Sequence, residues 1–97
     1  METHTLLAKI RKNPKSYLGE ISLKRLSSYL YGYSIRRYEL GKTELNSALD
    51  DFHTYVMKLY SDNSTFHFMT VISSNSNSEK EAFYKFYELY DEFFKKN

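Results

Sequence analysis

The sequence has no cysteine, no tryptophan, one proline and three glycines. Without cysteine, neither a disulfide nor a thiolate metal site can hold the fold together, and this absence is typical of a reducing compartment. So little proline and glycine argues against a disordered chain and against a turn-rich β-sandwich. No apolar run approaches the ~18 residues of a membrane-spanning helix, and the first residues lack the apolar centre of a secretory signal. We therefore expect a cytoplasmic protein without a membrane span.

Aromatic side chains are what the chain has in abundance. Ten Tyr and seven Phe make up 18% of its 97 residues, and such side chains bury a large area with few residues. Apolar positions recur at helical spacing along most of the chain. The sequence predicts an all-α fold, a compact bundle of about four to five helices around a single hydrophobic core, with residues 1–97 forming one domain.

The first half of the chain is organised around residues 13–33. Pro14 cannot lie in a helix interior and disfavours helical geometry at the residue before it, so we expect residues 4–12 to form a short helix and residues 13–21 a loop. Tyr17 and Leu18 are expected to fold back onto the core. Ser22 is a suitable N-cap for a central helix whose core face contains Leu23, Leu26, Leu30 and Tyr33.

Two glycines punctuate this central helix. Gly41 is a natural C-terminal stop, so the helix should end at Tyr38 or Leu40. Gly32 lies inside the helical pattern, where it costs about 1 kcal/mol relative to alanine. It either allows a neighbouring helix to approach closely or marks a bend.

The second half predicts three further segments. Thr43 is the best cap for a helix with a regular apolar stripe at Leu45, Leu49, Phe52, Val56 and Leu59. Residues 65–72 have the β-branched and aromatic content of a strand, but nothing else in the chain reads as its partner, so we expect a short buried helix there. Ser78 and Glu81 form a capping box before a helix with a continuous aromatic face at Phe83, Phe86, Tyr87, Tyr90, Phe93 and Phe94.

Charge divides the chain into unlike halves. Residues 1–43 hold nine Lys or Arg and three Asp or Glu, a net charge of +6, whereas residues 44–97 hold five and nine, a net charge of −4. The two halves are expected to attract each other within the fold. The basic half also suggests a nucleic-acid-binding or regulatory domain. Its phosphate contacts would be Lys9, Arg11, Lys12, Lys15, Lys24, Arg25, Arg36 and Arg37, and Tyr29, Tyr31 and Tyr38 would stack on bases unless they serve in packing.

Residues that could carry catalysis or bind a metal do not form a recognisable set. His4, His53 and His67 occur without a metal-binding spacing, and zinc needs three or four converging ligands. There is no GxSxG nucleophile motif and no glycine-rich phosphate loop. We therefore predict a protein that is not an enzyme and has neither a cofactor nor a metal.

Two stretches resemble a known family. Ile10–Tyr33 has the pattern I-R-K-x-P-x-x-Y-L-G-x-x-S-L-x-x-L-x-x-[FY]-L-x-G-Y, and Glu81–Phe93 has the pattern E-A-F-x-K-F-[YF]-x-L-x-x-E-F. Both patterns resemble small all-helical bacterial immunity proteins of toxin systems, including contact-dependent inhibition. The resemblance implies a protein that neutralises a cognate toxin, often a nuclease, by docking to it.

If this implication holds, the acidic second half suits a basic nuclease. The carboxylates expected to meet the toxin and to steer its approach are Asp50, Asp51, Asp62, Glu88, Asp91 and Glu92. The sequence gives no indication of the oligomeric state.

Overall fold

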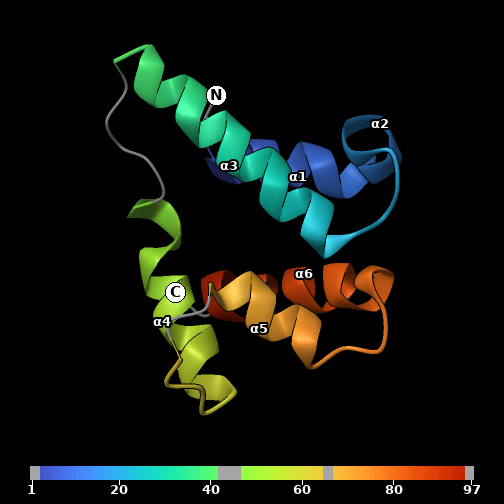
Figure 1. Ribbon diagram of the computed structural model, residues 1–97, viewed down its shortest axis with the longest axis vertical. Coiled ribbons are helices and arrows are strands. Elements are labelled where there is room, and N and C mark those ends of the chain that lie inside the picture. Colours follow the sequence, from blue (N-terminus) through green and yellow to red (C-terminus); the bar gives the residue numbers. More distant parts are fainter. Residues whose placement is uncertain (1–2, 42–46, 65–66, 96–97) are drawn as a thin grey trace.

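The structure is a computed structural model, and it describes residues 3–41, 47–64 and 67–95. Within these ranges the chain forms six helices and no strand, which confirms the all-α prediction. The helices are α1 (Thr3–Lys12), α2 (Pro14–Leu18), α3 (Leu23–Glu39), α4 (Ser47–Leu59), α5 (Phe68–Ser74) and α6 (Glu79–Lys95). Figure 1 shows α1, α2 and α3 in one layer, α5 and α6 in a second layer, and α4 along one side. The radius of gyration of 13.2 Å is that of a compact chain of this length.

The predicted loop at residues 13–21 contains an additional helix, so the helices outnumber the four to five that were expected. Pro14 occupies the first position of α2, where its fixed φ suits a helix and the missing N–H would have had no partner. Gly19 ends this turn at a φ of 83° and donates its N–H to Lys15 O. Leu18 is buried and Tyr17 packs against the core, as predicted.

The central helix α3 begins where the sequence predicted. The Ser22 hydroxyl accepts a hydrogen bond from the Arg25 N–H at 3.2 Å, and Gly41, with a φ of 80°, follows the helix end. Leu23, Leu26 and Leu30 are buried. A Cβ atom at Gly32 would have no atom within 4 Å, so no neighbouring helix approaches this glycine closely.

Helix α4 buries Leu49, Phe52 and Val56, as its apolar stripe predicted. The stripe fails at its last member, because the side chain of Leu59 is 52% exposed. Leu59 is the final residue of α4, and the next residue, Tyr60, packs against the core. The predicted cap Thr43 and the first stripe residue Leu45 lie outside the described residues.

Residues 68–74 form the short buried helix that was preferred over a strand. His67 is the N-cap of α5, and its Nδ1 atom accepts the N–H of Met69 at 3.2 Å. The helix buries Phe68, Met69, Val71 and Ile72 against α3 and α6. Tertiary packing here overrides a local preference for extended structure.

The last helix supplies most of the aromatic core. Ser78 Oγ accepts the N–H of Glu81 at 3.1 Å, the first of the two bonds of the expected capping box. Phe52 of α4 lies at the centre of a cluster of rings, with Phe68, Phe86, Tyr90, Phe93 and Phe94 at centroid distances of 5.4–5.9 Å. One core cluster takes buried side chains from all six helices, which confirms the single hydrophobic core.

Helices α1 and α6 join the basic and acidic halves of the chain. Arg11 makes two hydrogen bonds to the Asp91 carboxylate, at 2.9 and 2.7 Å, and its guanidinium lies 5.0 Å from the centre of the Tyr87 ring. The Tyr87 hydroxyl donates to Leu7 O at 2.7 Å. The predicted attraction between the halves is therefore present in this ion pair.

Candidate binding surface

Helix α3 has a second apolar stripe that faces solvent instead of the core. We define it as Tyr31, Ile35 and Tyr38, which are 70%, 43% and 68% exposed. These residues lie at i, i+4 and i+7, and therefore share one face of the helix. We had expected the tyrosines of this segment mainly in packing, and for Tyr31 and Tyr38 that expectation is wrong. The sequence did contain an indication of this exposure. Helix α3 has two apolar stripes, and one stripe is enough to pack a helix against a core.

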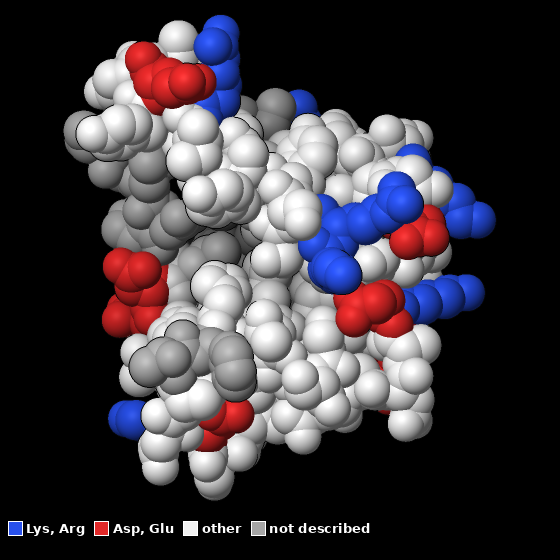
Figure 2. Space-filling model, viewed as in Figure 1, with Lys and Arg blue, Asp and Glu red and all other residues white. Residues whose placement is uncertain are grey.

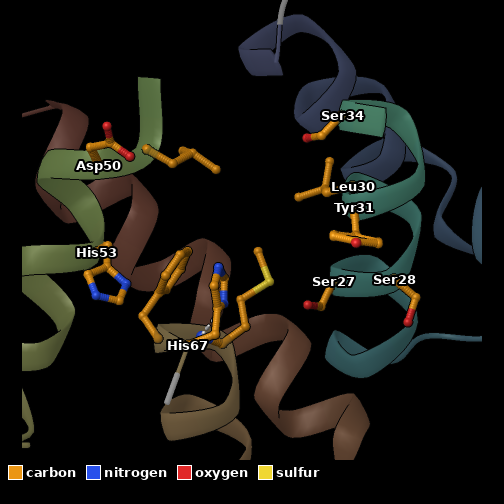
Figure 3. Close-up of a pocket in the computed structure, with 11 residues that line it drawn as sticks. Ser27, Ser28, Leu30, Tyr31, Ser34, Asp50, His53 and His67 are labelled. Atoms are coloured by element: carbon orange, nitrogen blue, oxygen red, sulfur yellow. Dashed lines mark hydrogen bonds between the residues drawn. The ribbon is translucent and has the colours of Figure 1, made fainter. Parts of the chain in front are cut away.

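The α3 stripe borders a pocket of about 710 Å³ between α3, α4 and the start of α5. Leu30, Leu49, Phe68 and Met69 line it and are almost completely buried. The other lining residues carry polar groups, namely Ser27, Ser28, Tyr31, Ser34, Asp50, His53 and His67. In Figure 3, Asp50 and His53 lie on the α4 wall, and the hydroxyls of Ser27 and Ser34 point toward them from α3. The volume is within the range of pockets that bind ligands or anchor side chains.

Among the described residues that line this pocket, the one fixed charge is negative. Among the described residues that line it, Asp50 carries a carboxylate and there is no Lys or Arg. The rings of His53 and His67 lie 6.0 Å apart, and the His67 ring packs 4.5 Å from that of Phe68. Partial desolvation, and then the neighbouring His53, lower the pKa of His67. At neutral pH His67 is therefore mainly uncharged, and Asp50 is the fixed charge among the described lining residues.

The six predicted carboxylates have different surroundings. Asp50 and Asp51 are exposed on the outer face of α4, and only Asp50 is among the residues lining the pocket beside the α3 stripe. Asp62 accepts the N–H of Ser64 at 2.7 Å in the turn after α4. Hydrogen bonding from the Ser64 side chain, and then from this N–H, lowers the pKa of Asp62.

Two of the three carboxylates of α6 face other elements of the fold, and the third, Glu88, pairs within α6. Asp91 binds Arg11, and this hydrogen-bonded contact lowers the pKa of Asp91. Glu92 accepts the hydroxyl of Tyr55 at 3.5 Å, and Glu88 lies 3.8 Å from the ammonium of Lys85. Asp91 therefore faces α1 while Glu92 faces α4, so these two neighbours do not present one common patch.

Several of the predicted basic contacts also have partners within the fold. Arg25 donates to Leu18 O at 2.9 Å and pairs with Glu20 at 3.0 Å. Arg37 donates to the hydroxyl of Tyr33 at 3.0 Å, and Arg36 lies 4.0 Å from Glu39. Arg25 and Arg36 are still exposed despite these contacts, as are Lys9, Lys12 and Lys15 on α1 and α2.

The histidines do not converge on a metal site. His4 Nδ1 shares a hydrogen bond with the Tyr90 hydroxyl, and the His4 ring packs edge-on against Phe94 at 4.9 Å. In the part of the chain that the structure describes, no group of three or more His, Cys, Asp or Glu side chains is arranged to hold a metal. In the same part, no helix has the length and apolar character needed to cross a membrane. No family model, no curated protein and no solved structure matches this chain.

Proposed function

We propose that this chain is a binding protein that neutralises a bacterial toxin by docking to it, in the manner of the immunity proteins it resembles. The toxin is proposed to be a nuclease, and the protein to act in the cytoplasm. The observation that carries the proposal is the α3 stripe, because Tyr31 and Tyr38 are largely exposed and Tyr31 also lines a pocket with buried apolar residues. Such inhibition requires an interface of about 800 Å² on each partner and no chemical step.

The composition of this face supports docking to a protein. Tyrosines are enriched among the residues that dominate binding energy at interfaces, and the centre of an interface is typically depleted in charge while its rim is polar. Figure 2 shows that the centre of the face over α3 and α5 is mostly uncharged and that charged side chains lie mainly toward its margins. Helix α3 is capped by Ser22 and packed against α5 and α6, so binding would order little of its backbone.

The acidic residues divide between two roles in this proposal. Asp50 and Asp51 are exposed on α4, where they would attract a basic nuclease during its approach. Asp91 is engaged by Arg11 at 2.7 Å, so we assign it to the stability of the fold instead of to docking.

The test uses the toxin domain encoded beside this gene, purified and titrated calorimetrically with this protein. We expect nanomolar affinity and loss of toxin activity at equimolar ratio. Tyr31→Ala and Tyr38→Ala should each weaken binding by about 2 kcal/mol, or roughly thirty-fold. The matched control is Tyr84→Ala on α6, because Tyr84 is 53% exposed but distant in sequence from α3. Equal losses in all three variants would contradict docking through α3, and lack of inhibition by the unaltered protein would contradict the immunity role.

The alternative function is nucleic-acid binding through the basic first half. The exposed Lys9, Lys12 and Lys15 favour it, because they lie within two consecutive helices. Retention on RNA or DNA that falls with salt, and that is lost in the double variant Arg36→Glu/Arg37→Glu, would support this alternative against the immunity proposal.

A further inference from the structure

We propose that the pocket between α3, α4 and α5 receives an arginine side chain of the protein partner. The inference rests on the proposed function and specifies the chemistry of the group that enters the pocket. It follows from three properties of the lining: its sign of charge, its apolar depth and its aromatic walls.

The sign of charge favours a cationic guest. Asp50 is the one carboxylate among the described lining residues, and no Lys or Arg accompanies it. The His67 ring is neutral at neutral pH because its pKa is lowered. Among the described lining residues, an anion would therefore meet a carboxylate and no Lys or Arg, whereas a cation would meet a favourable potential.

The depth of the pocket suits a cation on a long apolar stem. Leu30, Leu49 and Met69 line it and are almost fully buried, and their side chains can cover the methylenes of an arginine while its head stays near the polar rim. A metal ion or a small ammonium would leave this apolar surface uncovered.

The rim distinguishes a guanidinium from other cations. The planar, five-donor guanidinium binds a carboxylate through two parallel hydrogen bonds and stacks on aromatic faces. The pocket offers both kinds of partner, because Tyr31, Phe68 and the two imidazoles line it together with Asp50. In Figure 3, the hydroxyl of Ser27 faces the wall that carries Asp50, where it can accept an N–H group.

Asp50 is available for this role without damage to the helix. Its main-chain carbonyl accepts the Thr54 hydroxyl at 3.4 Å, and this bond does not depend on the side chain. Asp51 provides a matched control, because it is exposed on the same helix and one residue away but is not among the lining residues.

The experiment titrates the full chain with Nα-acetyl-arginine amide and follows backbone amides by NMR. We expect saturable shifts at residues 49–53 and 67–69 with a dissociation constant on the order of millimolar, as for a single anchor group. Asp50→Asn should weaken binding at least ten-fold and Asp51→Asn less than two-fold. Nα-acetyl-citrulline amide, which has the same shape without the charge, should give no saturable shift.

Three results would overturn the inference. The first is equal binding of the citrulline and arginine amides, and the second is equal loss in Asp50→Asn and Asp51→Asn. The third is micromolar binding of the free amide, which would indicate a small guanidinium metabolite instead of a partner's side chain. The titration needs no toxin, so its outcome is independent of whether the chain neutralises one. Once a toxin is identified, saturating arginine amide should weaken its binding.

Discussion

Replacing Gly32 with alanine should stabilise this protein. Gly32 lies in the interior of α3, and a Cβ atom there would have no atom within 4 Å. Alanine is favoured over glycine in a helix interior by about 1 kcal/mol, largely because it restricts the unfolded chain. With no steric cost in the folded state, the whole of this difference should appear as a higher free energy of unfolding. For a domain of this size it corresponds to a rise in Tm of roughly 4–8 °C.

The other two glycines are the controls for this prediction. Gly41 has a φ of 80° and nothing within 4 Å of an added Cβ. Gly41→Ala should therefore lower the free energy of unfolding only by the cost of placing alanine in the left-handed conformation, about 1–2 kcal/mol. Gly19 has a φ of 83°, and its added Cβ would lie 2.9 Å from Arg25 Nη1. Gly19→Ala should therefore be the most destabilising of the three, because it also disturbs the hydrogen bond from Arg25 to Leu18 O.

The assay is urea unfolding followed by far-UV circular dichroism, with the four proteins compared at one pH. The expected order of stability is Gly32→Ala, wild type, Gly41→Ala, Gly19→Ala. A Gly32→Ala protein less stable than the wild type would refute the reasoning, because it would mean that the backbone at Gly32 is bent or closely approached by another element.

Three further perturbations test the core and the capping of α5. Phe52→Ala should cost about 3–5 kcal/mol of stability, measured by urea unfolding, because Phe52 is fully buried at the centre of the aromatic cluster. Tyr87→Phe should cost about 1–3 kcal/mol by the same assay, because it leaves the buried Leu7 carbonyl without its 2.7 Å donor. The folded-state pKa of His67 lies below its ordinary value of 6.5, through desolvation and then His53, so the native state binds fewer protons than the unfolded state. The contribution of His67 to the free energy of unfolding should therefore be fully present above about pH 6.5 and should decrease as the pH falls toward 5. Urea unfolding across that pH range measures this decrease.

Each of these three predictions has a variant that should behave differently. Leu59→Ala removes an exposed aliphatic group and should change stability by less than about 0.5 kcal/mol. Tyr84→Phe alters an exposed hydroxyl and should be similarly neutral. His67→Asn keeps a cap acceptor and should flatten the decline below pH 6.5. An unchanged decline in that variant would assign the titration to another group.

The helices and the core could be predicted from local patterns. The aromatic face of α6 has an unbroken helical period, and Ser22 and Ser78 are strong caps in sequence and in structure. The helix Pro14–Leu18 was not predicted. A proline can occupy the first position of a helix or begin a loop, and the residues before it do not distinguish the two cases. Leu59 was misassigned because periodicity does not indicate where a helix ends: α4 ends at Leu59, and the next residue, Tyr60, packs against the core.

The candidate site was much less accessible to sequence reasoning. The tyrosines of α3 could be identified in the sequence, but their exposure could not be predicted. It depends on which of the two apolar stripes of α3 packs against another helix. The pocket combines Ser27, Asp50 and His67 from three segments, and no local rule relates their positions. The carboxylates were selected by charge alone, and one of the six, Asp91, forms an ion pair with the opposite half of the chain.

The contacts between α1 and α6 determine when this domain can fold during synthesis. Arg11 and Asp91 are 80 positions apart, as are Leu7 and Tyr87. A ribosome-bound chain that still lacks α6 has the core leucines of α1 without the α6 side chains that complete the core cluster, and is open to chaperones or to aggregation. Because contacts so distant in sequence form late, native structure should appear only after the last helix has emerged.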